Sequence, residues 1–230
     1  MFENSTDKMQ YDSSANSLAG SVYEQIKYDI LHCEFNPGDK LRLHALREKY
    51  GVGLSPIREA LSRLAVEKLV TSIEQRGFRV APVSKRDLED ILDMRTELEC
   101  LALSRSIDNG DDEWEARIVG AFHRLSLVLR TKDENSMQPN PDWEERHKEF
   151  HEALLSACGS PRLFTFVQTL ADQSSRYRRL AAKYSNQPRA DNREHKKIMD
   201  AVLARDKDKA ASLLVAHLRK TVKIVLAQQI

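Results

Sequence analysis

The chain has 230 residues, of which 41% are hydrophobic and 31% are charged, and its formal net charge is +1 at pH 7. It contains no run near the ~18 apolar residues of a membrane span and no apolar leader, so we expect a cytoplasmic protein without a membrane partner. Its three cysteines are odd in number and widely spaced, which argues against a disulfide framework and a cysteine-based zinc finger. The near-zero net charge neither favours nor excludes a nucleic-acid partner.

The local composition of the chain changes near residue 84. Residues 1–17 are polar and lack periodicity, so we expect a disordered tail there. Five of the eight glycines lie between Gly20 and Gly77, whereas the remainder reads as successive helical patterns. We therefore predict a small N-terminal domain over residues 18–84 and an all-helical domain over residues 85–230.

Within residues 18–84 the pattern predicts three helices followed by a hairpin. The predicted elements are an amphipathic helix over Ser17–Cys33, a turn at 36–39, a helix over Leu43–Tyr50, a helix opening at Ser55, and strands over Val70–Ile73 and Phe78–Val83. Ser55 is predicted to cap the third helix, with Pro56 at its first position. Helix, helix, turn, helix and β-hairpin make a winged helix-turn-helix.

The third helix has the pattern of a DNA-reading helix. Arg58 and Ser62 are turned away from its apolar stripe, and a guanidinium in this place suits bidentate pairing with guanine in the major groove. Further cations are expected to contact the phosphate backbone, namely Arg42, Arg47, Lys49, Arg63, Arg76 and Arg79. The plainer alternative is an ordinary helix start with solvated arginines.

Two segments, SPIREALSRL at 55–64 and QRGFRVAPVS at 75–84, carry a resemblance. Over roughly residues 18–84 the chain resembles the DNA-binding domain of the GntR superfamily of bacterial regulators. This resemblance implies that operator DNA is contacted by His44, Ser55, Arg58, Arg76 and Gly77. The segment before the third helix, GVGL at 51–54, departs from the polar or basic residues of the family, so the operator sequence does not transfer.

After residue 85 the pattern predicts six helices, near 86–107, 112–131, 142–158, 161–184, 190–205 and 207–228. We expect an antiparallel bundle that is mainly α. Four histidines lie in the apolar stripes of these helices, at His147, His151, His195 and His217. Any one of them alone is more simply a hydrogen-bonded core residue. Because burying an unpartnered imidazole is costly, four in register are expected to meet around a divalent metal, Zn²⁺ first and Ni²⁺ or a similar ion as the alternative.

Three segments of the helical region carry a second resemblance: DLEDILDMRTELE at 87–99, EFHEALLSACGSPRL at 149–163 and EHKKIMDAVLARDKDKAASLLVAHL at 194–218. They resemble the ligand-binding FCD domain of the FadR branch of the GntR superfamily. In its metal-containing members three histidines and an aspartate hold the ion. His151, His195 and His217 match the histidines, and His147 stands at the position of the aspartate. This exchange makes the site less anionic and leaves the identity of the metal open.

Arg95 lies in the buried stripe of the first helix of this region, where a guanidinium needs an anion. Glu99, one turn further on, is one candidate partner. The FCD resemblance implies instead that Arg95 faces an effector cavity and pairs with the carboxylate of a ligand whose other end binds the metal. Arg176, Tyr177 and Arg178 are expected to complete the clamp; the plainer alternative is that one or two of the three are solvated. Two positive poles would suit a dicarboxylate.

The chain as a whole resembles one group of that branch, the carbon-starvation-induced, glutarate-responsive repressors, through GVGLSPIREALS, DEWEA, RHKEFH, CGS and AVLARD. The resemblance implies a homodimeric repressor that reads double-stranded operator DNA and is released by glutarate or a related dicarboxylate. Two alternatives stay open. In a metal-responsive regulator the ion itself is the signal. A metal-dependent hydrolase is disfavoured, because Lys148 stands where an HExxH motif needs glutamate.

Overall fold

The computed structural model describes residues 18–74, 76–131, 140–182 and 191–227. The chain divides into two compact units. Residues 31–33 and 82–230 form the C-terminal unit, and the rest of the chain up to residue 81 forms the N-terminal unit. Each unit is described by itself. The tail predicted to be disordered, residues 1–17, lies outside the described residues.

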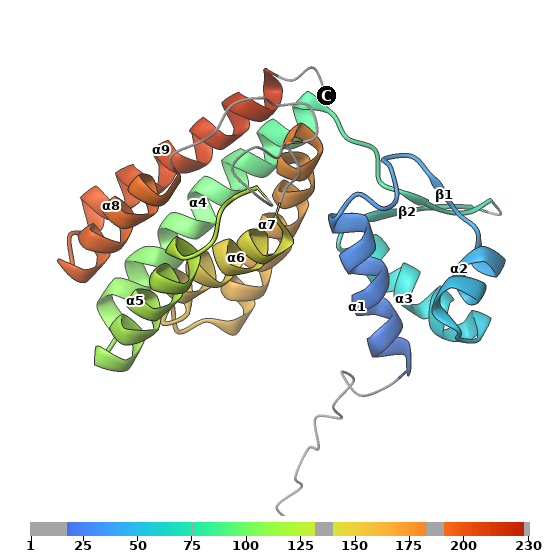
Figure 1. The fold of residues 1–230 in the computed structure, drawn as a ribbon, viewed down its shortest axis with the longest axis horizontal. Coiled ribbons are helices and arrows are strands. Elements are labelled where there is room, and N and C mark those ends of the chain that lie inside the picture. Colours follow the sequence, from blue (N-terminus) through green and yellow to red (C-terminus); the bar gives the residue numbers. More distant parts are fainter. Residues whose placement is uncertain (1–17, 75, 132–139, 183–190, 228–230) are drawn as a thin grey trace, which may run out of the picture. The chain divides into compact units, whose positions relative to one another are not determined.

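The N-terminal unit is a winged helix-turn-helix, as the order of its elements predicts (Figure 1). Its elements are α1 (Leu18–Leu31), β1 (Lys40–Leu41), α2 (Leu43–Tyr50), α3 (Leu54–Val66), β2 (Val70–Ile73) and β3 (Gly77–Val80). The strands form an antiparallel sheet in the order β1-β3-β2, in which Arg79 lies between Lys40 and Thr71. Strand β1 was not predicted, because two residues are too few to show an alternating pattern.

Apolar residues at helical spacing form the core of this unit. Val22, Ile26 and Ile30 of α1 and Ile57, Leu61 and Leu64 of α3 are all 0% exposed. Each such side chain contributes roughly 1.5–3 kcal/mol by leaving water. Burial of this stripe turns the opposite face of α3, with Arg58 and Ser62, toward solvent.

Helix α3 begins two residues earlier than predicted, at Leu54 instead of Pro56. Gly53 is its N-cap residue, and no side chain accepts a hydrogen bond at that cap. Ser55 is the second residue of the helix and has a helical backbone, so its hydroxyl does not take the capping position. The predicted cap at Ser55 is therefore wrong. The third strand is also shorter than predicted and ends at Val80 instead of Val83.

The C-terminal unit is a bundle of the predicted helices, and the fold class is confirmed (Figure 1). Its described helices are α4 (Lys85–Asn109), α5 (Asp112–Ser126), α6 (Pro141–Leu155), α7 (Pro161–Ala182), α8 (Asp191–Leu203) and α9 (Lys207–Leu226). Helix α4 packs against α7 and α9, and α5 packs against α6 and α8. Helix α5 ends before its predicted limit at residue 131, because Leu127 and Leu129 beyond it remain 65% and 50% exposed and have little core to join.

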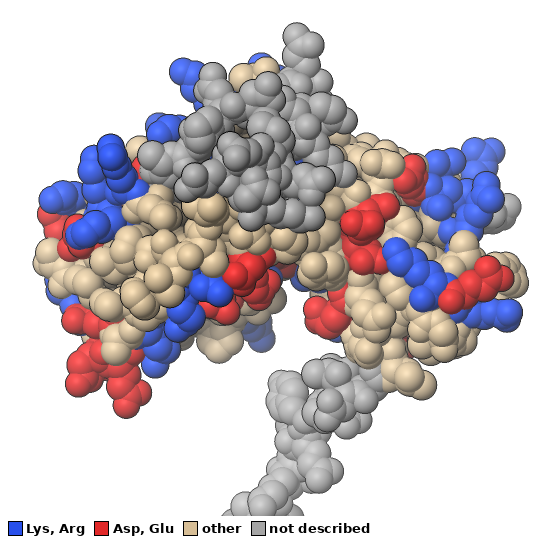
Figure 2. Space-filling model, viewed as in Figure 1, with Lys and Arg blue, Asp and Glu red and all other residues tan. Residues whose placement is uncertain are grey.

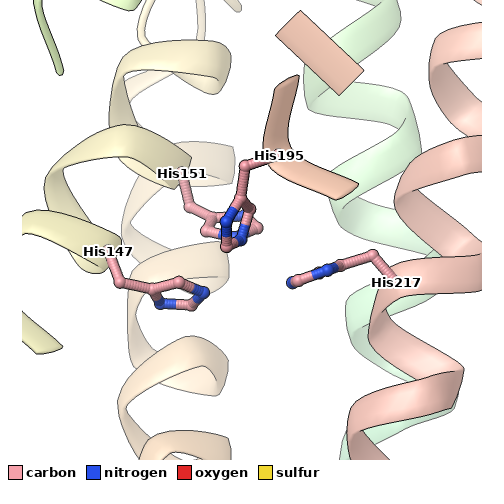
Figure 3. Close-up of side chains that lie close together, drawn as sticks. All are labelled: His147, His151, His195 and His217. Atoms are coloured by element: carbon pink, nitrogen blue, oxygen red, sulfur yellow. The ribbon is translucent and has the colours of Figure 1, made fainter. Parts of the chain in front are cut away.

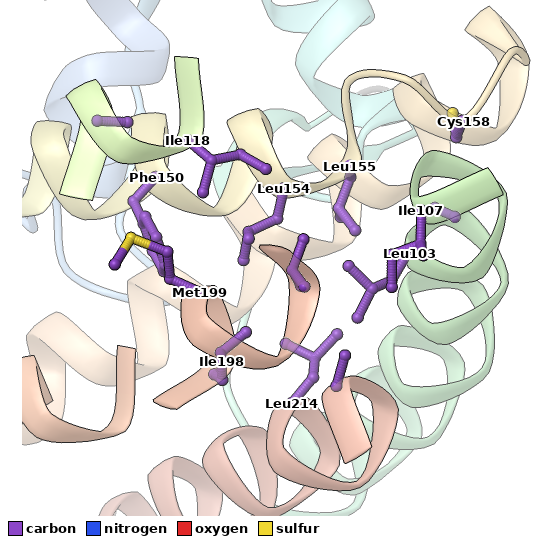
Figure 4. Close-up of a cluster of buried hydrophobic side chains, with 14 of the residues drawn as sticks. Leu103, Ile107, Ile118, Phe150, Leu154, Leu155, Cys158, Ile198, Met199 and Leu214 are labelled. Atoms are coloured by element: carbon purple, nitrogen blue, oxygen red, sulfur yellow. The ribbon is translucent and has the colours of Figure 1, made fainter. Parts of the chain in front are cut away.

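The core of the bundle draws buried apolar side chains from all six helices (Figure 4). Leu103, Ile118, Phe150, Ile198 and Leu214 are among its members, each at most 1% exposed. The indole of Trp114 adds a hydrogen bond from Nε1 to the carbonyl oxygen of Ala153 at 2.9 Å, which joins α5 to α6. None of the helices that the structure describes has both the length and the apolar character to cross a membrane.

Candidate metal and effector site

The structure brings together the four histidines that the sequence places on inner helix faces (Figure 3). His147 and His151 lie one turn apart on α6, while His195 comes from α8 and His217 from α9. The distances between their ring centroids run from 4.5 Å for His147 and His151 to 6.1 Å for His147 and His217. One nitrogen of each ring lies within 4.8 Å of the corresponding nitrogen of every other ring. Three helices thus place four potential ligand atoms around one point.

The four rings are removed from water. Their exposed fractions are 8% for His147, 9% for His151, 0% for His195 and 5% for His217. Burial, followed by the charges of the neighbouring histidines and Arg178, lowers the pKa of His147 and of His151 well below the ordinary value of 6.5. No described residue offers a hydrogen bond to either ring nitrogen of His151. Burial therefore favours neutral imidazoles at His147 and His151, whose lone pairs can bind a cation.

Neighbouring side chains orient two of the rings. Nδ1 of His217 lies 3.0 Å from Oε2 of Glu194. Because the carboxylate accepts this hydrogen bond, Nδ1 carries the proton, which leaves Nε2 as the ring nitrogen that can bind a metal, as in carboxylate–histidine–metal arrangements. The ring of His147 stacks on the indole of Trp143, with centroids 4.7 Å apart and planes inclined by 23°.

The donor set fits a divalent transition metal. Imidazole nitrogen is a preferred ligand of Zn²⁺ and Ni²⁺, and two nitrogens on opposite sides of such an ion are at most about 4.2 Å apart at metal–nitrogen distances of ~2.1 Å. The observed limit of 4.8 Å is slightly wider, so small side-chain rotations would close the cluster on an ion. The residues that would hold it are His147, His151, His195 and His217.

The charge of Arg95 on α4 contributes to the lowered pKa of His151, so its side chain lies within electrostatic range of the cluster. Its Nε donates to Oε1 of Glu99 at 2.6 Å in a pair that is 9% and 1% exposed. The Glu99 partner that the sequence leaves open is thus present. It engages only Nε: among the described residues none accepts a hydrogen bond from the two terminal nitrogens of Arg95. Those two nitrogens form the fork that binds a carboxylate in bidentate fashion.

The predicted clamp of Arg176, Tyr177 and Arg178 does not form as a unit. Arg178 is bonded to the helix that carries His147: its Nη2 donates to Glu144 at 2.5 Å, and its charge contributes to the lowered pKa of His147. Arg176 and Tyr177 instead bond to residues at the start of the C-terminal unit. Successive residues on a helix point about 100° apart, so three in a row cannot face one ligand.

The six predicted DNA-contacting residues are all exposed on the N-terminal unit. They are His44 on α2, Ser55, Arg58 and Ser62 on α3, and Arg76 and Gly77 at the hairpin. Ser55, Arg58 and Ser62 follow one another at spacings of three and four and therefore share a face of α3. Gly77 opens β3 with a φ of +86°, which L side chains rarely adopt.

Basic side chains gather around the hairpin and α2 in this unit, with acidic ones among them (Figure 2). Three of the predicted phosphate-contacting cations have partners within the unit. Lys49 pairs with Asp29 at 2.7 Å, the Arg63 guanidinium lies 4.1 Å from the ring centroid of Tyr23, and Arg79 donates to the Gly38 carbonyl at 2.8 Å. Arg42, Arg47 and Arg76 are exposed and suit a phosphate backbone better.

Sequence reasoning missed three residues of the histidine site. Trp143 and Glu144 precede His147 by four and three residues on α6, a spacing that places both near its ring. That spacing was a usable signal. Glu194 stands directly before His195 but bonds to His217 on another helix, so no local pattern could have indicated its role.

Two family models match the chain: the gntR family of bacterial regulatory proteins over residues 18–80 and the FCD domain over residues 90–220. The regulator BphR of Paraburkholderia xenovorans (strain LB400), itself described as uncharacterised, is 37% identical over 213 residues, which are 93% of this chain and 87% of that protein. The transcriptional repressor GlaR of Escherichia coli (strain K12) is 36% identical over 207 residues, which are 88% of this chain and 93% of the repressor.

A solved structure supports the same fold. The structure of E. coli McbR/YncC superposes with a TM-score of 0.77 and 20% identity, covering 93% of this chain and 99% of that one. BphR and GlaR are named as transcriptional regulators and not as enzymes, as we expected for this chain. The chain is therefore a DNA-binding transcriptional regulator that belongs to the gntR family and carries an FCD domain.

Proposed function

We propose that this regulator is a homodimeric, cytoplasmic repressor whose affinity for operator DNA is lowered by a small dicarboxylate bound beside a histidine-held metal. Glutarate or a close relative is the proposed effector, in keeping with the resemblance to the glutarate-responsive repressors. The observation that carries the proposal is the cluster of four buried histidines together with Arg95, whose terminal nitrogens have no described partner and whose charge contributes to the lowered pKa of His151.

The charges around the cluster support an anionic ligand. Histidine ligands add no negative charge to a divalent ion. The carboxylates of Glu99 and Glu144 are paired with Arg95 and Arg178, and Glu194, which bonds to His217, also pairs with Lys220. A loaded site would therefore carry an uncompensated positive charge in a medium that excludes water. A bound divalent ion would supply a Lewis-acidic anchor for one carboxylate. Arg95 would hold the second carboxylate through its terminal nitrogens.

The direction of regulation and the subunit number rest on further arguments. GlaR, which is 36% identical to this chain, is named a repressor, and the proposal carries that direction over. A winged helix-turn-helix covers only a short stretch of major groove. Two copies reading a palindrome supply the affinity and specificity that a single unit lacks. Sedimentation velocity of the full chain tests the dimer.

A thermal-shift panel tests the effector. Zn²⁺-loaded protein and chelator-treated protein are each heated with C4, C5 and C6 dicarboxylates, and with a C5 monocarboxylate as control. At 100 times its Kd, a ligand adds about 2.7 kcal/mol to the stability of the unit that binds it. We expect a shift with glutarate on the metal-loaded protein only. The effector proposal fails if no acid produces a shift on the metal-loaded protein.

A matched histidine pair tests the metal site. His151→Ala removes a buried ring of the cluster, whereas His123→Ala removes an exposed ring of α5. Zn²⁺ should raise the melting temperature of wild type and His123→Ala and have little effect on His151→Ala.

A metal-responsive regulator is the second candidate function. It would be favoured if Zn²⁺ alone changed the affinity for an operator duplex while the dicarboxylates had no effect.

A further inference from the structure

The start of α4 is held by a tyrosine of α7. The Tyr177 hydroxyl accepts from the backbone N–H of Ser84 at 3.0 Å and donates to Oδ2 of Asp87 at 2.5 Å. Ser84 is the N-cap residue of α4, and its side chain accepts from the backbone N–H of Asp87 at 3.1 Å. Burial, followed by the bond to Asp87, raises the pKa of Tyr177 to about 12, so its hydroxyl remains a donor at neutral pH. Tyr177 therefore reinforces the cap from outside the helix.

The preceding residue of α7 holds the chain segment that leads into this cap. Nη2 of Arg176 donates to the backbone carbonyl of Pro82 at 2.9 Å. Arg176 is only 4% exposed, and no described residue offers a hydrogen bond to its Nε or Nη1. A buried guanidinium with two unsatisfied donors costs free energy. Another position of this chain segment that offered Arg176 more hydrogen-bond acceptors would therefore compete with the position observed.

Residues 82–84, which we call the linker, directly follow the last residue of the N-terminal unit, Ala81. Their two anchors, Arg176 and Tyr177, lie in the C-terminal unit, as does the linker itself. Whatever displaces α7 relative to α4 must therefore change the position of the linker or break one of these hydrogen bonds.

Helix α7 is tied to the histidine site at the next residue. Arg178 donates to Glu144 through Nη2 at 2.5 Å and through Nε at 3.3 Å, and the two side chains are 10% and 5% exposed. Glu144 precedes His147 by three residues on α6. Three consecutive residues of α7 thus contact the linker, the cap of α4 and the helix that carries two of the clustered histidines.

Arg95 connects α4 to the same site. It lies eight residues after Asp87, about 12 Å further along the helix at ~1.5 Å per residue. A ligand that joins Arg95 on α4 to an ion held partly by α6 would act on both helices that α7 bridges. Because α4 is a continuous helix, a displacement at Arg95 would be carried toward its N-terminus, where Tyr177 bonds to Asp87.

We propose that Arg176 and Tyr177 are positioning residues that tie the linker to the histidine site through α7, so that effector occupancy changes how the linker is held. The proposal rests on the proposed function for its effector. The free energies of effector binding and operator binding are coupled through these hydrogen bonds.

The test compares Tyr177→Phe with Tyr50→Phe. Both changes remove a tyrosine hydroxyl bonded to an aspartate, but Tyr50 bonds to Asp29 at 2.7 Å in the N-terminal unit. Operator affinity is measured with and without saturating glutarate on the Zn²⁺-loaded full chain, using a duplex that the wild-type protein selects from a random library. Glutarate affinity is measured separately by calorimetry.

We expect Tyr177→Phe to bind glutarate within about twofold of wild type, while the ratio of the operator affinities without and with glutarate falls at least about fivefold. Tyr50→Phe should keep the wild-type ratio.

A second variant and a second measurement test the same hydrogen bonds independently. Asp87→Ala removes the acceptor at an exposed position and should lower the ratio without disturbing the buried ring of Tyr177. Hydrogen exchange of residues 82–88 reads the anchoring directly and needs no effector. It should be at least about tenfold faster in Tyr177→Phe than in wild type. Unchanged exchange, or a wild-type ratio in Tyr177→Phe with intact glutarate binding, overturns the proposal. If glutarate does not change the operator affinity of the wild-type protein, but the exchange of residues 82–88 differs between wild type and Tyr177→Phe, only the proposed effector is refuted.

Discussion

Arg95 is held by Glu99 through a single nitrogen: Nε lies 2.6 Å from Oε1, in a pair that is almost completely buried. A guanidinium can form two parallel hydrogen bonds with a carboxylate, and here its terminal fork is directed to no described residue. The intrahelical pair fixes the orientation of the side chain without using the part of it that recognises anions.

Replacing Arg95 by lysine should therefore weaken glutarate binding even though the charge is kept. Loss of a charge-assisted bidentate contact costs about 1.5–3 kcal/mol, which corresponds to a roughly 10- to 150-fold higher Kd. Calorimetry on the Zn²⁺-loaded protein measures the change. Arg124→Lys, which alters an exposed pair with Glu149, should leave the Kd unchanged. Wild-type affinity in Arg95→Lys would exclude Arg95 from the effector site.

Arg58→Ala should reduce operator affinity, because Arg58 stands exposed on the face of α3 that suits the major groove. A bidentate contact to guanine discriminates by about 1–3 kcal/mol, so we expect a loss of roughly 5- to 150-fold on the selected duplex. Fluorescence anisotropy on the selected duplex and on an unrelated duplex separates base reading from phosphate contact. An equal loss on both duplexes would assign Arg58 to the backbone. Arg105→Ala, in the C-terminal unit, is the control.

Glu144→Gln should destabilise the C-terminal unit strongly. It leaves the buried guanidinium of Arg178 without its counter-charge, and breaking a buried pair in this way costs about 3–5 kcal/mol. Glu89→Gln breaks the exposed pair with Lys85 and should cost less than about 1 kcal/mol. Urea denaturation of the two variants gives the comparison. Similar midpoints for both would show that the Arg178 pair contributes no more than a surface contact.

The metal-free protein should lose stability in mild acid. Since the folded-state pKa values of His147 and His151 lie well below 6.5, unfolded chains bind protons below pH 6.5 that folded chains do not. The unfolding free energy should therefore fall as pH drops from 6.5, by about 1.4 kcal/mol per pH unit for each histidine. Above pH 6.5 these two groups contribute no slope. Denaturant titrations at several pH values, with His151→Gln for comparison, measure it. If the unfolding free energy of His151→Gln fell as steeply with decreasing pH as that of wild type, the result would contradict the lowered pKa of His151.

Two glycines should respond to alanine in opposite directions. A Cβ at Gly110 would lie 2.0 Å from the Trp114 ring, so Gly110→Ala must displace a fully buried indole and should cost more than about 2 kcal/mol. At Gly120, inside α5, the nearest atom is the flexible end of Arg124 at 3.5 Å. Gly120→Ala should stabilise the helix by about 0.5–1 kcal/mol. Thermal denaturation distinguishes the two, and equal melting temperatures would count against the packing of Trp114.

The sequence by itself determined what depends on local periodicity. The six helices of the bundle, the winged helix-turn-helix and the inward position of His147, His151, His195 and His217 follow from apolar residues recurring every three to four positions. This spacing fixes which face of a helix is buried. The spacing does not indicate which residues of other helices that face contacts, and it does not predict elements as short as β1.

Only the tertiary structure decided the partners across helices. Neighbours in sequence point in different directions on a helix, so Arg178 reaches Glu144 while Tyr177 reaches Asp87 and the start of α4. The same holds for Glu194, which stands beside His195 and yet orients His217. These pairings join residues 23 to 90 positions apart. They exist because packing of the apolar stripes brings separate helices together, and a pattern within one helix carries no information about the side chains of the next.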